Sequence, residues 1–251
     1  GSLLAYTCKP LTGTEYALST DSDIFLYDFA TKATRNLSKE AASRIDEKFV
    51  GYDKYPVFSP DGRKIAFRSQ RRPGNEADQQ RLWVYDLDTD ECRYITRNHD
   101  ICATEVVWDG NEAMYFVLPW RATHQIAHID LEGNLKHITA GDHDINSFTM
   151  AGGRIVANMN TISKAVELYD VDVNSGALSQ ITDVNREIYD NIRFGKVEKR
   201  WIDTTDGKKM LTWVILPPGH YNKNAKSPFE TFYMGGDGMS SYSSYSTEYI
   251  S

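Results

Sequence analysis

The chain has 251 residues, 41% of them hydrophobic and 12% aromatic, so it can bury a substantial core. Its formal net charge of -7 argues against binding a phosphate backbone, which needs clustered Lys and Arg, and we expect no nucleic-acid partner. No apolar run approaches the roughly 20 residues of a membrane span, so none is expected in this chain.

At the start of the chain, Gly1-Ser2 is expected to be a cloning remnant, with any signal peptide lost upstream. A repeated unit then follows, which is easiest to recognise at its end. A hydrophobic residue followed by Ser or Thr recurs, at steps of 58, 43 and 43 residues, as Leu37-Ser38, Ile95-Thr96, Ile138-Thr139 and Ile181-Thr182. About nine residues earlier stand Tyr27-Asp28, Tyr85-Asp86, Ile129-Asp130 and Val171-Asp172. Turn-forming residues follow each Asp, so each unit is predicted to close with a β-hairpin.

The first half of each unit also reads as two strands around a turn. The clearest case is Pro56 to Phe67, where Ser59-Pro60-Asp61-Gly62 supplies the turn. Variants recur at Val106 to Phe116 and at Phe148 to Val156, while the polar insertion Arg71 to Gln80 explains the longer first step. Four short strands per unit of about 43 residues predict the four-stranded blades of a β-propeller. Sustained helical periodicity is missing, so we predict an all-β chain with about four blades.

Cysteine and histidine give no metal site. Cys8, Cys92 and Cys102 are too few and too irregularly spaced for a zinc site or a disulfide framework. His124 and His128 have the i, i+4 spacing that binds metal on a helix, but the surrounding residues predict a strand. His99-Asp100 and His143-Asp144 recur at the same position of the repeat, which favours a structural role between blades. We therefore expect neither a metal nor another cofactor.

A different kind of segment follows the repeats, from Lys196 onward. Trp201, Asp203 and Thr205 alternate as in a strand, Asp206-Gly207 provides a turn, and a second strand leads to Pro217-Pro218-Gly219. The segment from Trp201 to Gly219, together with the Ser-Pro-Asp-Gly blades, resembles the prolyl oligopeptidase family of serine peptidases, especially bacterial dipeptidyl and acylaminoacyl peptidases. In that family a propeller is followed by a linker of this type, which opens an α/β-hydrolase domain. The resemblance implies blades over residues 3–195 and the linker with a truncated start of the peptidase domain over 196–251.

The catalytic residues of such a hydrolase are not identifiable in this sequence. The family's nucleophile lies in a Gly-x-Ser-x-Gly turn, followed in chain order by an Asp and a His. Gly236 to Ser240 contains Gly and Ser without that spacing. We therefore expect the chain by itself not to hydrolyse peptide bonds.

Three residues are site candidates through the resemblance. Tyr233, which is followed by Met234 and two glycines, matches the family's Tyr that donates to the developing oxyanion, although the usual Gly-Gly-Pro is absent. Propellers of the resembled exopeptidases also supply carboxylates that hold the free amino terminus of the peptide. Glu76 and Asp78, in the one lengthened blade, are the candidates for that role, and a solvated polar loop is the alternative.

The predicted function is a non-catalytic propeller fragment of a serine exopeptidase that admits and selects short peptides. The alternative is a stand-alone propeller of the TolB type, used for protein binding, which would not need the hydrolase-entry strands. The resemblance also favours a periplasmic or secreted bacterial location. Since four blades do not close the family's ring of seven or eight, we expect open flanks and a homodimer, through the blade beginning near Leu3 and the one ending near Ile181.

Overall fold

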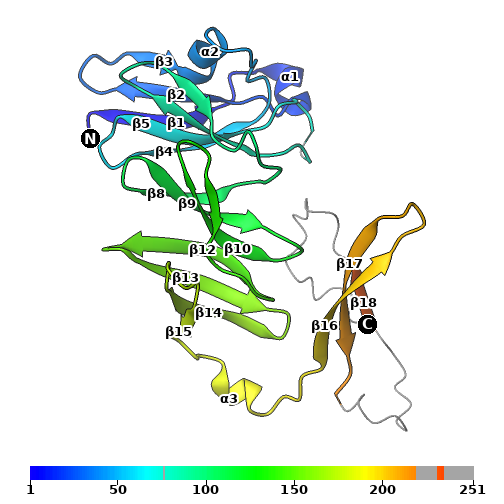
Figure 1. Cartoon of the computed structure of the whole chain (residues 1–251). Coiled ribbons are helices and arrows are strands. Elements are labelled where there is room, and N and C mark those ends of the chain that lie inside the picture. The colour runs from blue at the N-terminus through cyan, green and yellow to red at the C-terminus, as the bar shows by residue number, and fades with distance from the viewer. Residues whose placement is uncertain (76, 219–230, 235–251) are drawn as a thin grey trace. The chain divides into compact units, whose positions relative to one another are not determined.

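The computed structural model describes residues 1–75 and 77–218, and the backbone of 231–234. Its regular structure is almost entirely β, which confirms the predicted fold class (Figure 1). The chain divides into two compact units: the first comprises residues 1–118 and 127–136, and the second comprises 119–126 and the residues from 137 onward. The predicted domain boundary between residues 195 and 196 stays a prediction. Among the described residues, no helix is long and apolar enough to cross a membrane.

The first unit is built from antiparallel strands that follow one another along the chain. One sheet has the order β1-β2-β3, and a second has the order β4-β5-β6-β7. The strands are β1 (Leu3–Cys8), β2 (Asp23–Asp28), β3 (Thr34–Asn36), β4 (Asp53–Phe58), β5 (Lys64–Ser69), β6 (Arg81–Asp86), β7 (Cys92–Tyr94), β8 (Thr104–Asp109) and β9 (Ala113–Pro119). Strand β10 (His124–Asp130) contributes to both units and pairs with β11 (Leu135–His137). Strands that follow one another along the chain are therefore neighbours in these two sheets, as expected for propeller blades, although a short helix lies between β1 and β2 and the insertion of residues 71–80 lies between β5 and β6.

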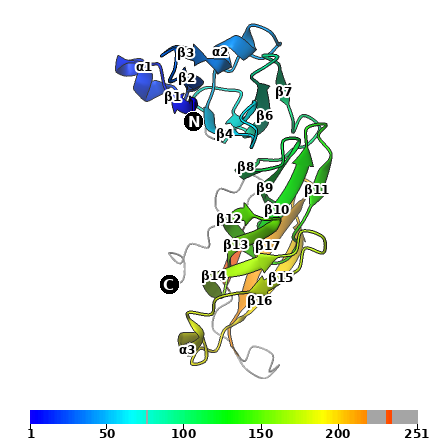
Figure 2. The same cartoon turned by 90° about the vertical axis from the view of Figure 1, so that its left-hand side faces the viewer.

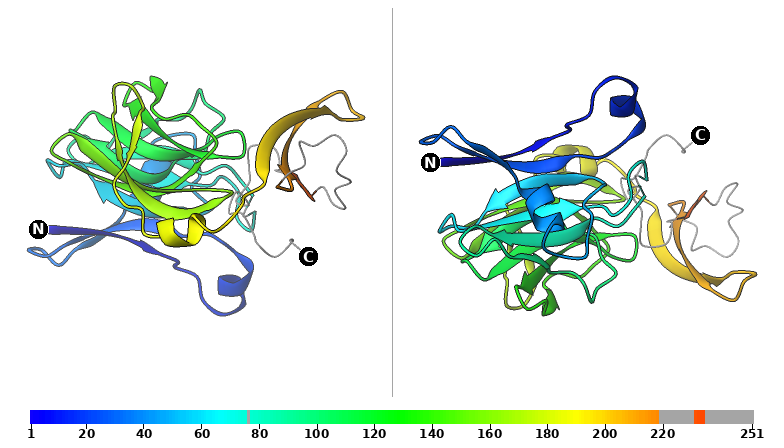
Figure 3. Two further views of the ribbon diagram at one scale, coloured as in Figure 1. Left: turned by 90° about the horizontal axis from the view of Figure 1, so that it is seen from below. Right: turned by 90° about the horizontal axis from the view of Figure 1, so that it is seen from above.

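Two short helices interrupt the first unit. Helix α1 (Gly13–Leu18) lies in the connection between β1 and β2 (Figure 3), and α2 (Leu37–Ala42) lies between β3 and β4 (Figure 2). The pair Leu37-Ser38 thus begins a helix, where the sequence predicted the end of a hairpin strand. The side chain of Asn36 causes this change, because it accepts a hydrogen bond of 3.0 Å from the Lys39 backbone N–H and caps the helix.

The predicted closing hairpins are held by the recurring Asp. In each repeat one carboxylate oxygen accepts a hydrogen bond from the backbone N–H two residues further on, at 2.7 to 3.1 Å. The pairs are Asp28 with Ala30, Asp86 with Asp88, Asp130 with Glu132, and Asp172 with Asn174. This side-chain acceptor imitates a backbone turn, which is why Asp recurs at the end of the strand.

The recurring Ser or Thr hydroxyl at the end of each sequence repeat has an equally local role. In every repeat the hydroxyl oxygen accepts a hydrogen bond from a backbone N–H of the preceding long strand, at 2.9 to 3.1 Å. The pairs are Ser38 with Ile24, Thr96 with Leu82, Thr139 with Ile126, and Thr182 with Leu168. Ser38 keeps this bond even though it lies in a helix, so the hydroxyl, and not the strand, is what the repeat preserves.

Alternation along β6 divides the core of the first unit into two clusters. Leu82 and Val84 point to one side, where they pack with Met114 and other residues of β8 to β10. Trp83 and Tyr85 point to the other side, where they join a cluster that includes residues of β2 and α2. Successive side chains of a strand point to opposite faces, and β6 is buried on both, which accounts for its unbroken apolar run from Leu82 to Tyr85.

The second unit contains one more blade and the segment that follows it. Strands β12, β13, β14 and β15 pair antiparallel in chain order. A short helix follows, and β16, β17 and β18 form a separate antiparallel sheet. The bounds are β12 (Asp144–Ala151), β13 (Arg154–Thr161), β14 (Lys164–Val171), β15 (Leu178–Gln180), α3 (Arg186–Tyr189), β16 (Lys196–Asp203), β17 (Lys209–Leu216) and β18 (Thr231–Met234). The predicted strand pair around Asp206-Gly207 is thus confirmed, and Gly207 has the positive φ of 78° that its turn requires.

Candidate functional site

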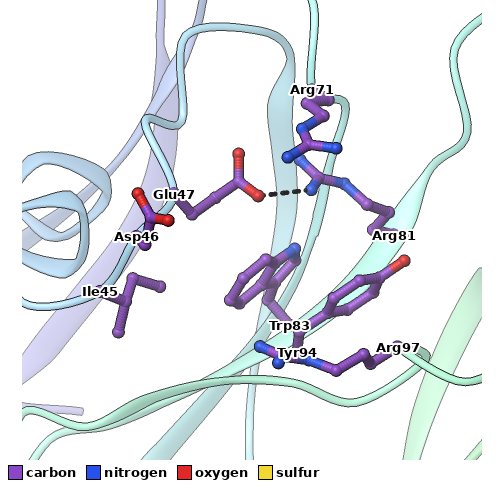
Figure 4. A pocket seen from close by; sticks show the side chains of 8 residues that line it. All are labelled: Ile45, Asp46, Glu47, Arg71, Arg81, Trp83, Tyr94 and Arg97. Carbon is purple, nitrogen blue, oxygen red and sulfur yellow. Dashed lines mark hydrogen bonds and ion pairs between the residues drawn. The ribbon is translucent and has the colours of Figure 1, made fainter.

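Two cavities of the first unit are lined by Arg71 of the insertion of residues 71–80. One has a volume of about 360 Å³ and is lined by Ile45, Asp46, Glu47, Arg71, Arg81, Trp83, Tyr94 and Arg97 (Figure 4). The other, of about 440 Å³, shares Arg71, Arg81 and Tyr94 with it and adds Arg72, Asp78 and Gln79. The lengthened blade therefore does border cavities, and arginine dominates their charged lining.

Strands β6 and β7 position the aromatic wall of the smaller cavity. Arg81 and Trp83 are two residues apart on β6, so they share one face, and Trp83 pairs in register with Tyr94 of β7. The rings of Trp83 and Tyr94 stack at 4.9 Å with an interplanar angle of 14°. The Arg81 guanidinium lies 5.5 Å from the Tyr94 ring centre, and that of Arg97 lies 5.9 Å from the same ring. This wall holds two cations by their interaction with the ring faces.

An ion pair joins the two sides of the smaller cavity. Nη1 of Arg81 donates to Oε2 of Glu47 at 2.8 Å, and the two side chains are only 7% and 12% exposed. Glu47 comes from the segment between α2 and β4, so the pair links residues 34 positions apart. Figure 4 shows the Glu47 carboxylate, the Arg81 guanidinium and the indole nitrogen of Trp83 converging on one space. Charge neutralisation and burial together fix the position of the Arg81 side chain.

Several donors of this cavity have no hydrogen-bond partner within the described part of the chain. They are Nε and Nη2 of Arg81 and Nε1 of Trp83, all of them buried. A buried donor without a partner costs about 1–3 kcal/mol, and more when it is charged. The cavity therefore presents donors where a ligand with acceptor atoms would stabilise it.

Asp78, one of the predicted carboxylates, organises the insertion. Its Oδ2 accepts from the backbone N–H groups of Arg71 and Arg72 at 3.0 and 2.9 Å, and its Oδ1 pairs with Nη2 of Arg72 at 3.0 Å. Burial raises the pKa of Asp78, but the Arg72 guanidinium and these backbone donors outweigh it and hold the pKa below its ordinary value. Asp78 is thus ionised and engaged within its own loop at the edge of the larger cavity. Glu76, the other predicted carboxylate, lies outside the described residues.

The structure places Tyr233 on β18, whose backbone pairs with β17, Tyr233 lying opposite Trp213. Its predicted role as an oxyanion donor stays a prediction. The sequence from Gly236 to Ser240 lies outside the described residues.

The two histidines with metal-like spacing lie on one strand and have separate carboxylate partners. His124 and His128 are both on β10, as predicted, and their nearest ring nitrogens lie 3.0 Å from Asp144 and from Asp109, respectively. His99 contacts the carbonyl oxygen of Gly133 at 2.8 Å. Among the residues that the structure describes, no group of three or more His, Cys, Asp and Glu side chains could hold a metal ion.

Glu47, Arg81 and Trp83 were not among the residues predicted from the sequence. A signal for Arg81 was nevertheless present. In each repeat, the Ser or Thr hydroxyl at the end accepts a hydrogen bond from the backbone N–H of a strand residue, and the residue directly before that one is polar and buried. These residues are Asp23, Arg81, Gln125 and Glu167. Arg81 is the one cation in this series, and it lies in the blade with the insertion.

Comparisons with known proteins agree with the fold and with the resemblance. The chain is 36% identical over 238 residues to dipeptidyl-peptidase 5 of Porphyromonas gingivalis, an alignment that covers 94% of this chain and 34% of that protein. The resemblance to the prolyl oligopeptidase family is confirmed. The chain spans about a third of the length of the dipeptidyl-peptidase relatives that it matches. No family model matches it.

Solved structures of peptidases support the architecture. The acylaminoacyl peptidase of Pyrococcus horikoshii matches with a TM-score of 0.63 at 19% identity, over 86% of this chain and 31% of that one. The β-propeller domain of the Trilobed protease from Pyrococcus furiosus matches with a TM-score of 0.53 at 19% identity, over 73% of this chain and 53% of that one. At such identities these matches show the fold alone, which is that of β-propeller blades.

Proposed function

We propose that this chain is the propeller segment of a dipeptidyl-peptidase or acylaminoacyl-peptidase type of serine exopeptidase, in which it admits and selects short peptides. The observation that supports this most is the alignment to dipeptidyl-peptidase 5 over 94% of the chain. The β16–β17 hairpin, which the family uses to enter its hydrolase domain, supports it as well. The cavities beside the insertion are the proposed place of selection, because a peptide offers charged and polar groups that arginines and carboxylates can pair.

Within this proposal the insertion recognises the free amino terminus of the peptide. An ammonium group taken from water must be paired with acceptors, and carboxylates form the strongest such pairs. Asp78 already pairs with Arg72, so Glu76 is the residue we propose for direct contact, with Asp78 holding the loop in place.

The test uses the longer peptidase that the relatives imply. Glu76→Gln should reduce kcat/KM for substrates with a free amino terminus by about 10- to 150-fold, which corresponds to one charge-assisted hydrogen bond. N-acylated substrates of the same sequence should be affected much less. Glu132→Gln, a change in an exposed hairpin of another repeat, is the matched control. Equal losses for both substrate types would contradict the role of the insertion.

The outer face of the last blade supports the further proposal of a homodimer. Leu168 and Ile181 are 42% and 53% exposed, whereas Leu82 and Ile95, at the same positions of the second repeat, are 0% and 4% exposed. The apolar residues that are buried in the second repeat are thus exposed in the last blade, which favours association of two chains through this face. Light scattering at several concentrations should show a mass above the monomer, and Leu168→Lys should reduce it. A monomeric mass at all concentrations would contradict this proposal.

A further inference from the structure

Position 81 departs from the pattern that the other repeats keep. At the equivalent positions, Gln125 accepts from the Thr139 hydroxyl at 2.8 Å, Glu167 accepts from the Thr182 hydroxyl, and Asp23 accepts from the Asn36 amide at 2.7 Å. Each of these side chains is an acceptor that closes its own blade. An arginine has five N–H donors and no acceptor, so Arg81 cannot take this part.

Arg81 instead directs unused donors into the smaller cavity. One of its N–H groups is paired with Glu47, and, among the described residues, Nε and Nη2 lack partners, as does Nε1 of the neighbouring Trp83. A ligand that fits three converging donors must bring several acceptor lone pairs. A carboxylate has two oxygens with about four lone-pair sites and is matched by the planar guanidinium.

The charges around the cavity favour an anion of this size. Arg71, Arg81 and Arg97 line it, against two carboxylates, Asp46 and Glu47. The local excess is therefore positive in a chain whose net charge is -7. The volume of about 360 Å³ accommodates a small organic group but not a folded partner.

We propose that this cavity binds a carboxylate group of a peptide, with Arg81 and Trp83 as the direct donors and Arg71 and Arg97 as the surrounding positive charge. The proposal deepens the proposed function and rests on it, since it names a second chemical group by which peptides are selected. The carboxylate has two possible sources in a short peptide, the C-terminus and an Asp or Glu side chain.

The experiment titrates the 251-residue chain with four dipeptides by isothermal calorimetry at low ionic strength, where electrostatic binding is strongest. The peptides are Ala-Glu and Ala-Gln, each with a free and with an amidated C-terminus. Loss of the carboxylate that is bound should weaken binding by about tenfold or more. A loss on amidation identifies the C-terminus, and a loss from Glu to Gln identifies the side chain. Acetate is titrated in parallel as the isolated group.

Arg81→Gln should abolish the preference for the carboxylate. Gln stands at the equivalent position of another repeat, so this change is compatible with the blade. Because it leaves the buried Glu47 unpaired, the double variant Glu47→Gln/Arg81→Gln is measured beside it. Arg63→Gln, which removes an exposed pair with Asp88, is the matched control and should bind as the unmodified chain does.

The possible results separate this inference from the proposed function. Peptide binding that does not change with either carboxylate overturns the inference and leaves the proposed function standing. Acetate binding that requires Arg81, without binding of any peptide, supports the carboxylate site and contradicts the proposed function. If neither acetate nor a peptide binds, both are rejected.

Discussion

Replacing Thr139 with Val should strongly destabilise the second unit, although the two side chains have almost the same shape. The Thr139 hydroxyl accepts from the Ile126 backbone N–H at 2.9 Å and donates to Oε1 of Gln125 at 2.8 Å. All three residues are almost completely buried. The substitution therefore leaves one buried donor and one buried acceptor without these partners.

Each buried group that loses its partner costs about 1–3 kcal/mol, so the expected loss is about 2–6 kcal/mol. Such a loss is large beside the roughly 5–15 kcal/mol by which a typical domain is stable. It would be measured as a shift of the urea midpoint, multiplied by the m-value, in unfolding followed by circular dichroism.

Thr139→Ser is the matched control. It keeps the hydroxyl and both hydrogen bonds and removes one methyl group, for which we expect a loss of about 1 kcal/mol. If the Val variant proves no less stable than the Ser variant, then the hydroxyl is not what secures the end of the repeat, and the reasoning is refuted.

Three further predictions follow from single positions. Gly176→Ala should lower the melting temperature of the chain more than Gly152→Ala does. Both glycines have positive φ, which costs an alanine about 1–2 kcal/mol, but only at Gly176 would the new Cβ lie 2.1 Å from the Ile138 carbonyl oxygen. Equal losses of stability would disprove the clash. Burial raises the pKa of Asp53 to about 7, so ionising this buried carboxyl should destabilise the fold. The loss of stability should be absent below about pH 4, grow as the pH rises to about 7, and then level off. Asp53→Asn should flatten this part of the plot of unfolding free energy against pH, and an unchanged plot would contradict the prediction. Exposed Cys8 should react with a maleimide in the native chain, whereas Cys92, whose thiol pKa is raised by burial, should react only on unfolding, which mass spectrometry of labelled peptides would decide.

Local features of this protein were predictable because their causes lie within a few residues. The Asp that ends a strand, such as Asp86, bonds the N–H group two positions later, and Gly207 supplies the positive φ of its own turn. Both signals are visible in the sequence, and both were confirmed. Helix α2 shows the limit of this reasoning, since Leu37-Ser38 matched the strand-ending pattern but the Asn36 cap began a helix there.

The candidate site was only partly predictable. The insertion pointed to a blade that borders cavities, yet the carboxylate of Asp78, which looked available for a ligand, is used by Arg72 and by the backbone of its own loop. Such an engagement cannot be read from residue types, because it depends on how the loop closes.

The sequence by itself determined the repeat, the β-architecture and the resemblance to a peptidase family, because strand period and turn chemistry act over short distances along the chain. Only the tertiary structure decided that Arg81 faces a cavity beside Trp83 and is paired with Glu47 across 34 residues of sequence. The physical reason is that burial and the availability of partners depend on how distant segments pack. The same kind of position therefore closes a blade when it holds Gln125, whereas Arg81 at that position has donors without a partner among the residues that the structure describes.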